Sequence, residues 1–211
     1  MHGHDAESDT SGGAALPAIE VVRSSGRVRT SSARVRDGRI VIRLPAHLSA
    51  RDADRATGDL LTRLRAKATS PGPISALPRR VSPVRATRGA RGPRGDHALV
   101  ERADRVAATR LPDHDVRPGS VTWSHRMTTR WASITLRGRR VRVSHRLADA
   151  PEVVLDVLLL HELAHVVEGG HGPAFRALVG RHPDHADVEA WLARRTHDEL
   201  RAALGLPVPP I

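Results

Sequence analysis

The chain has 211 residues, of which 39% are hydrophobic, so it is long enough for one domain with a sizeable core. Cysteine is absent, which excludes disulfides and thiolate metal sites and leaves nitrogen and oxygen as the available metal ligands. The net charge of +11 makes nucleic acid a candidate partner, but an aromatic content of 2% leaves few side chains for base stacking.

The first part of the chain predicts a tail followed by strands. Residues 1–17 are small, polar and rich in Gly and Ser, a composition that cannot bury enough apolar surface to become ordered. From Ile19 the segment IEVVRSS indicates a strand. The segment SARVRDGRIVIRLP places Asp37-Gly38 between two runs with apolar residues at alternate positions. We therefore expect an N-terminal β-hairpin with a tight turn at Asp37-Gly38.

A helix and a linker follow the hairpin. The segment from Ser49 to Ala68 predicts a helix, because Ser49 suits the N-cap and leucines at positions 60, 61 and 64 recur at helical spacing. Residues 69–95 accumulate Pro, Gly and Arg, which resist both helix and ladder formation, so we expect a mobile insertion there. A further helix is predicted from about Asp96 to Arg110.

The second half of the chain predicts a small sheet and a buried helix. The segments SVTWS, RWASITL and RRVRVS, with Arg137-Gly138 at the turn between the last two, predict a small antiparallel sheet. The next segment, PEVVLDVLLLHELAHVVEGG, begins with Pro151 and Glu152, which suit a first helical turn, and ends at Gly169-Gly170. Because this segment is nearly all apolar, we expect the helix to be buried.

The elements together predict a single α+β domain over residues 18–205. Two shorter helices, at about 173–180 and 183–204, follow the buried helix, and residues 206–211 form a C-terminal tail. In this domain the small sheet packs on the buried helix, and the N-terminal hairpin and the extra helices surround them.

The buried helix carries the residues with the clearest chemistry. The HELAH motif at 161–165 places His161 and His165 four residues apart on one helix face, where both can bind one tetrahedral ion. Glu162 lies beside them and can act as general base without occupying a ligand position. A catalytic zinc site needs a third protein ligand and an open fourth position, and His171 follows after a double-glycine reversal. Three imidazoles suit Zn²⁺ better than Mg²⁺ or Ca²⁺.

Other residues are weaker candidates for the same site. Glu168 is an alternative to His171 as the third ligand. Trp131 is a candidate for the cleft wall, although a tryptophan in a short sheet is commonly part of the core. Five further side chains could orient ligands or stabilise an oxyanion, although each is more simply a surface group or a helix cap: Asp156, His125, His145, His182 and His185.

These motifs resemble the YgjP-like (DUF45) metallopeptidase family, which is related to the SprT and M48-type zincins. In that family a strand with an RWGSC-like motif precedes HELxH, and a His and then a Phe follow. The chain has RWASI at 130–134 and HELAHVVEGGHGPAF at 161–175. Ala132 and Ile134 depart from the family's Gly and Cys, whereas the ligand positions all match. The resemblance extends over residues 19–204 and implies a zincin-like fold, a zinc ion and peptidase activity.

We therefore expect a zinc-dependent metallopeptidase that cleaves a peptide or protein substrate with ion-activated water and Glu162 as general base. Two alternatives are a zinc-dependent nucleotide phosphoanhydride hydrolase on the same site and a non-catalytic, metal-stabilised nucleic-acid-binding protein. The longest wholly apolar run, Val157 to Leu160, is too short to cross a bilayer, and the first residues resemble no secretory signal. We expect a cytoplasmic location and no membrane partner. The sequence does not indicate an oligomeric state.

Overall fold

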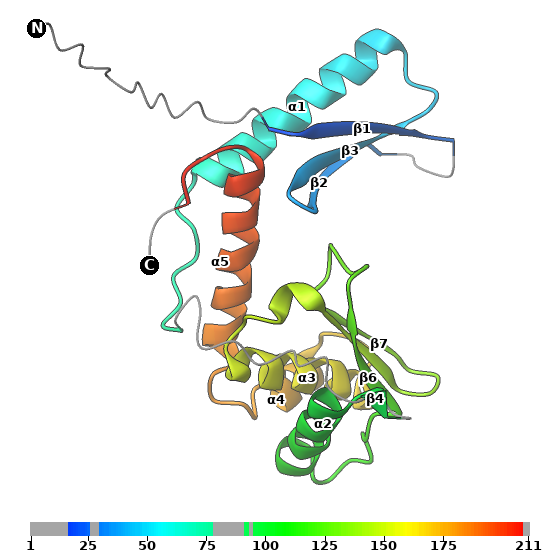
Figure 1. The fold of residues 1–211 in the computed structure, drawn as a ribbon, viewed down its shortest axis with the longest axis vertical. Coiled ribbons are helices and arrows are strands. Elements are labelled where there is room, and N and C mark those ends of the chain that lie inside the picture. The colour runs from blue at the N-terminus through cyan, green and yellow to red at the C-terminus, as the bar shows by residue number, and fades with distance from the viewer. Residues whose placement is uncertain (1–16, 26–29, 78–90, 93–94, 209–211) are drawn as a thin grey trace, which may run out of the picture.

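The computed structural model describes residues 17–25, 30–77, 91–92 and 95–208. Five α-helices and two small mixed sheets make up this part of the chain, which confirms the α+β class and is compatible with a zincin-like fold (Figure 1). Most of the expected N-terminal tail lies outside the described residues. Among those residues, none of the helices combines the length and the apolar character needed to cross a membrane.

The N-terminal sheet contains the predicted hairpin. Its strands are β1 (Ile19–Ser24), β2 (Ser32–Arg36) and β3 (Arg39–Pro45), in the order β1-β3-β2. β2 and β3 pair antiparallel around Asp37 and Gly38, whose φ angles of 50° and 74° are the left-handed values that a tight hairpin turn requires. β1 pairs with β3 in parallel, so one edge of β2 has no pairing strand in the part of the chain that the structure describes.

Helix α1 (Ala50–Thr69) packs against this sheet and begins where the sequence predicts. The Ser49 side chain accepts a hydrogen bond from the backbone N–H of Asp52 at 3.1 Å, which satisfies one of the free donors of the first turn. Leucines of α1 share one hydrophobic cluster with alternate residues of β3 that are completely buried: Ile40, Ile42 and Leu44. The hairpin and α1 therefore form a small lobe with its own core.

The second sheet is mixed, so the prediction of a small antiparallel sheet is wrong. Its strands run in the order β4-β5-β6-β8-β7, with these bounds: β4 (Arg91–Gly92), β5 (Gly95–Asp96), β6 (Ser120–Ser124), β7 (Ala132–Thr135) and β8 (Arg140–Ser144). β7 and β8 form the expected hairpin, but β6 pairs with β8 in parallel. β8, with Val141 and Val143 completely buried, lies between β6 and β7, and β7 is the edge strand among the described residues.

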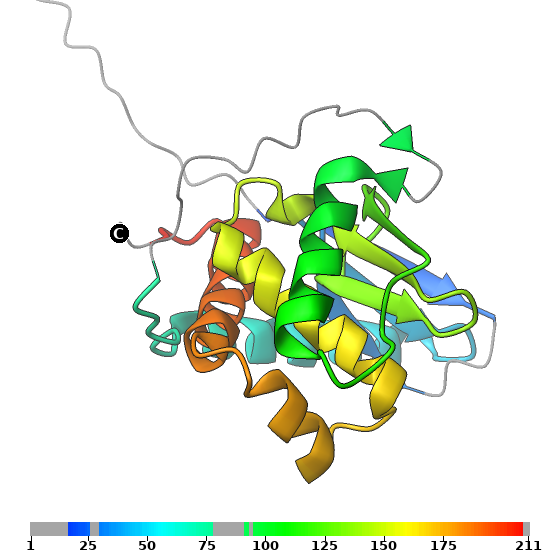
Figure 2. The same ribbon diagram turned by 90° about the horizontal axis from the view of Figure 1, so that it is seen from below.

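Helix α3 (Glu152–Val167) lies against this sheet and is the long apolar helix predicted from the sequence. It contacts β7, α2 (His97–Arg110), α4 (Pro173–Val179) and α5 (His185–Ala203). Figure 2 shows α2 and α3 beside the sheet. The buried residues of α3 include nearly every position from Val154 to Ala164. The helix that carries the HELAH motif is therefore enclosed by protein on most of its surface.

Helix α5 connects this N-terminal lobe to a second lobe, which consists of the five-stranded sheet and helices α2 to α4. Val188 and Trp191, near its start, are buried in the cluster around α3, whereas Leu200 and Ala203, near its end, are buried in the cluster of α1 and β3. Figure 1 shows α5 running from one lobe to the other. Because both ends of one rigid helix are buried, α5 sets how the lobes are placed relative to each other.

The structure also describes the start of the expected insertion at 69–95. Arg194 of α5 donates hydrogen bonds to the backbone carbonyls of Pro73 and Ser75, at 3.0 and 3.1 Å. Leu77 packs against the core around α3. These residues are therefore bound to α5, while 78–90 and 93–94 of the expected insertion lie outside the described residues.

Arg102 of α2 offers a direct test of how α3 is held. Only 9% exposed, it donates hydrogen bonds to the side chains of Glu152 and Asp156, both at 2.7 Å. We predict that Arg102→Met lowers the free energy of unfolding by about 2–3 kcal/mol in urea denaturation, because it removes the cation between two carboxylates. As a control, Arg36→Met breaks the exposed pair with Asp37 and should cost less than about 0.5 kcal/mol. Equal losses in the two variants would contradict this account.

Candidate metal centre

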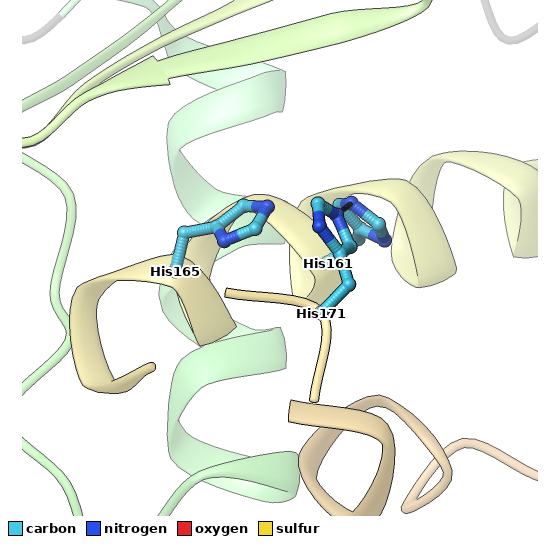
Figure 3. A group of neighbouring side chains, drawn as sticks. All are labelled: His161, His165 and His171. Carbon is cyan, nitrogen blue, oxygen red and sulfur yellow. Dashed lines mark hydrogen bonds between the residues drawn. The ribbon is translucent and has the colours of Figure 1, made fainter. Parts of the chain in front are cut away.

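Three histidines meet at the C-terminal end of α3 (Figure 3). His161 and His165 project from one face of the helix, and His171 approaches them from the loop between α3 and α4. One ring nitrogen of each lies within 4.8 Å of the others, and the Nε2 atoms of His161 and His171 are 3.4 Å apart. The structure thus brings together the three side chains that the sequence singled out as metal ligands.

The local sequence explains why His171 returns to the helix. α3 ends at Val167, and the backbone N–H of Glu168 bonds to the carbonyl of Ala164 at 2.9 Å. α4 begins at Pro173, at a position where the missing N–H of proline costs nothing. A loop of only a few residues, rich in glycine, therefore joins two fixed helix ends, and His171 lies within it.

Two neighbours fix the orientation of the imidazoles. The Nδ1 atom of His165 lies 3.3 Å from the backbone carbonyl of Glu168, a contact that favours a proton on Nδ1 and leaves Nε2 for a ligand bond. The ring of Phe175 stacks on His165 with centroids 4.5 Å apart and lies edge-on to His161 and His171 at 4.9 and 4.7 Å. Phe175 is 2% exposed, so it forms a buried floor under all three histidines.

Burial favours the neutral, metal-binding form of two of the imidazoles. Burial, helped by the neighbouring His165 and His171, lowers the pKa of His161 to about 4. Burial also lowers the pKa of His165. Neutral imidazole is the ligand form, so these rings need not lose a proton to bind an ion near pH 7. Two ligands at about 2.05 Å from a tetrahedral zinc lie about 3.3 Å apart, close to the His161–His171 separation. The three nitrogen donors, one pair of them at this separation, can hold a metal ion such as zinc.

A cleft of about 400 Å³ lies between this end of α3 and strand β7. Glu162 and the histidines line one side, and Arg130, Ser133 and Ile134 line the other. Glu162 is 7% exposed, and burial raises its pKa to about 7, against the opposing effects of the Ile134 backbone N–H and the charge of Arg130. A buried carboxyl group with a high proton affinity thus faces the same cleft as the three imidazoles.

Two residues of the site could not be singled out from the sequence. The motif includes Phe175, but its spacing four residues after His171 does not show that one ring contacts three imidazoles. Ser133 lies in the cleft wall, and its hydroxyl oxygen is buried without a hydrogen-bond partner among the described residues. In the sequence, only the position of Ser133 within the RWASI segment could have indicated that it belongs to the site. A buried hydroxyl of this kind is free to bond a bound ligand.

The other sequence candidates lie elsewhere. The carboxylate of Glu168 accepts a hydrogen bond from the Gly170 N–H at 3.5 Å and is not part of the histidine cluster. Trp131 lies under the guanidinium of Arg146, with 4.0 Å between the guanidinium carbon and the ring centroid. The remaining candidates have other neighbours and do not line the cleft: Asp156 binds Arg102, His182 accepts from the Asp184 N–H, His185 faces Glu189, and His125 stacks on His145.

A histidine cluster beside a buried glutamate in an open cleft fits a metal-dependent hydrolase. A family model described as YgjP-like, metallopeptidase domain, matches residues 98–195, a segment that contains the three histidines and Glu162. This match supports the YgjP-like family that the sequence resemblance predicted. The match is shorter than the expected range of 19–204, because the strands β1 to β5, helix α1 and the end of α5 lie outside it. Searches of curated proteins and of solved structures gave no significant match.

The raised pKa of Glu162 predicts that the stability difference between wild type and Glu162→Gln depends on pH. Between its unfolded value of 4.5 and about 7 the folded state binds more protons, so ionising Glu162 costs stability as pH rises through this window. In metal-free protein, Glu162→Gln should therefore be more stable than wild type at pH 8, by up to about 3 kcal/mol, and the difference should vanish near pH 4.5. The lowered pKa of His161 removes stability as pH falls from 6.5 to about 4, but it acts in both proteins. If urea denaturation gives a difference in free energy of unfolding between the two proteins that stays constant with pH, this account is wrong.

The position of Phe175 under the imidazoles predicts that one substitution can lower metal affinity and another can lower stability. Phe175→Leu keeps an apolar side chain but removes the flat surface under the imidazoles, so metal affinity should fall about tenfold or more in a chelator competition. Leu178→Ala, one turn further along α4, opens a cavity in the same cluster without removing that surface. It should lower the melting temperature and change the affinity little. Equal affinity in wild type and Phe175→Leu would show that the phenyl ring does not position the ligands.

Proposed function

We propose that the chain is a zinc-dependent metallopeptidase that hydrolyses peptide bonds in the cleft between α3 and β7. The observation that carries this proposal is the convergence of three imidazoles beside a buried carboxylate and an unpaired strand edge. Each of these parts has a separate role in amide hydrolysis.

His161, His165 and His171 would hold the ion. Their neutral nitrogen donors, without thiolate or carboxylate, suit zinc in a site with three protein ligands. A zinc ion bound there supplies Lewis acidity and lowers the pKa of water to about 7. Burial favours the neutral form of His161 and His165, and contacts with Phe175 and the carbonyl of Glu168 orient the rings.

Glu162 would move the proton. In its ionised form the carboxylate accepts a proton from the attacking water, and in its protonated form it donates that proton to the departing amine. A pKa near the working pH lets one group perform both steps, and burial raises the pKa of Glu162 to about 7. Arg130, whose charge favours the ionised form, limits this rise.

Strand β7 would position the substrate. It is the edge strand of its sheet, and its residues line the cleft. An extended peptide can add to such an edge through backbone hydrogen bonds, which hold the peptide bond in a defined register without restricting the side chains. Leu136, at the rim of the cleft, is 56% exposed and offers an apolar contact for a substrate side chain.

The cleft favours a peptide over a nucleotide. A triphosphate needs several cations around it, and Arg130 is the single arginine or lysine among the described residues that line the cleft. The unpaired edge of β7 has no role in phosphoanhydride cleavage. Assays of the zinc-loaded protein with unfolded protein and with nucleoside triphosphates distinguish the two substrates, and we expect turnover of the first.

Variants of the ligands and of the base should fail differently. His161→Ala, His165→Ala and His171→Ala should each lose bound zinc and also the thermal stability that zinc adds, because the ion joins α3 to the following loop. Glu162→Gln should keep zinc and fold while turnover drops by roughly 10² to 10⁴. Metal analysis, melting curves and peptide-cleavage rates measure the three quantities.

Glu168→Ala is the matched control for the third ligand. It should keep full zinc, since the carboxylate of Glu168 is not part of the cluster. If Glu168→Ala loses zinc while His171→Ala retains it, the assignment of His171 is wrong. If Glu162→Gln keeps full activity, Glu162 does not transfer the proton.

A further inference from the structure

We infer that the groove between the two lobes is a second substrate subsite, which takes an acidic side chain located on the leaving-amine side of the cleaved bond. This inference rests on the proposed peptidase function, because it names the kind of peptide that the same site would accept. The groove lies apart from the metal centre and is lined by both lobes and by α5.

The groove has the size and the walls of a side-chain site. Its volume is about 230 Å³, and apolar walls come from Val35 of β2, Leu64 of α1, Leu200 of α5 and Trp131. Trp131 is partly buried and packs against the core around α3. These surfaces can pack against the alkyl part of a side chain or against a peptide backbone.

An unpaired strand edge borders the groove. Ala33, Arg34 and Val35 are consecutive residues of β2, and all three line the groove. Because side chains alternate between the two faces of a strand, three consecutive residues can line one groove only when the strand edge faces it. β2 is the edge strand of the N-terminal sheet, so backbone groups of this edge are available to a bound peptide.

The groove and the metal cleft are lined by neighbouring residues. Arg130 lines the cleft and Trp131, the next residue, lines the groove, so both hollows border the short segment just before β7. Glu162 and Ile134 of β7 both line the cleft. Ile134 and Trp131 are three residues apart, which corresponds to about 10 Å of extended chain. A peptide on the β7 edge therefore reaches the groove three or more residues from the cleaved bond.

The direction of the peptide decides which side reaches the groove. β7 runs from the groove toward Leu136, and its existing partner β8 is antiparallel to it. Antiparallel pairing is the more common arrangement at a strand edge. A substrate antiparallel to β7 runs toward the groove, so the residues on the C-terminal side of the cleaved bond enter it.

The charge of the groove selects an acidic residue. Arg146 and Glu199 form an ion pair at its base, and the guanidinium of Arg146 covers Trp131, so these two charges are already matched. Arg34 and Lys67 line the groove and are exposed, and neither has an acidic partner in the part of the chain that the structure describes. Asp37 borders an adjoining hollow but lies 3.7 Å from Arg36. The unmatched charge of the groove is therefore positive.

Both cations belong to the lobe outside the family match. Arg34 lies on β2 and Lys67 on α1, whereas the match covers residues 98–195. The metal centre and the proton-transfer group lie wholly inside the matched segment. The groove thus adds a recognition element of this chain to the chemistry of the matched domain.

Binding of uncleaved peptides tests the groove without relying on turnover. We would use the full-length, zinc-loaded chain with Glu162→Gln and fluorescent peptides that carry Glu, Gln or Lys at the third to fifth positions after the bond to be cleaved. The Glu peptides should bind about fivefold to tenfold more tightly than the Gln peptides, and less so at high salt. Arg34→Glu combined with Lys67→Glu should reverse the preference toward Lys.

Arg65→Glu provides the matched control. Arg65 is exposed on α1 two residues from Lys67, which places it on the opposite side of the helix. It changes the net charge by as much as either groove substitution but should leave the preference for Glu unchanged. Melting curves and zinc content of all variants should match the parent protein, because Arg34 and Lys67 are exposed.

Cleavage kinetics separate failure of the groove from failure of the proposed function. In the active chain, the double groove variant should raise KM for Glu peptides with kcat nearly unchanged, since the lost contacts are remote from the reacting bond. Normal cleavage with no charge preference, or with a preference on the N-terminal side of the bond, overturns the groove and leaves the peptidase proposal standing. Charge-selective binding without any cleavage supports the groove and overturns the peptidase.

Discussion

Helix α3 is held by packing on several sides at once, and the candidate metal centre depends on that packing. Its apolar residues contact β7, α2, α4 and α5, so the C-terminal end that carries His161, Glu162 and His165 has a fixed position. Burial has two chemical consequences there. It disfavours the protonated form of His161 and the ionised form of Glu162. The same packing therefore prepares a neutral ligand and a carboxyl group with a pKa near 7.

The two lobes are joined by contacts that leave the metal centre intact and define the groove. α5 buries Trp191 near α3 and Leu200 near α1, so a single rigid element relates the lobes. Arg195 holds α5 to the lobe that contains α3 by donating to Asp149 at 2.8 Å and to the backbone carbonyl of Arg146 at 2.7 Å. None of these contacts involves the three histidines. The position of the N-terminal lobe can therefore determine which peptides enter without altering how the ion is held.

Sequence patterns predicted the local elements and the ligand spacing, because both depend on residues close together in the chain. Ser49 as an N-cap, the hairpin turn at Asp37 and the HELAH motif are of this kind. The parallel pairing of β6 with β8 could not be predicted, since alternation shows which face of a strand is buried but not which strand lies beside it. The groove could not be predicted either, because its walls come from residues that are far apart in the chain. Arg34 and Trp131 are distant in sequence, and only the packing of α5 brings them together.

The distribution of positive charge suits the metal site and the groove that we propose. The chain carries a net charge of +11, yet the metal cleft contains Arg130 as its single described basic residue apart from the histidines. Further cations beside three imidazoles would repel a divalent ion, and the repulsion would be strong where burial reduces screening. A chain that recognises acidic side chains therefore has to do so at a distance from the ion. Arg34 and Lys67, in the other lobe, meet this requirement, because an extended substrate can contact them and the cleft at the same time.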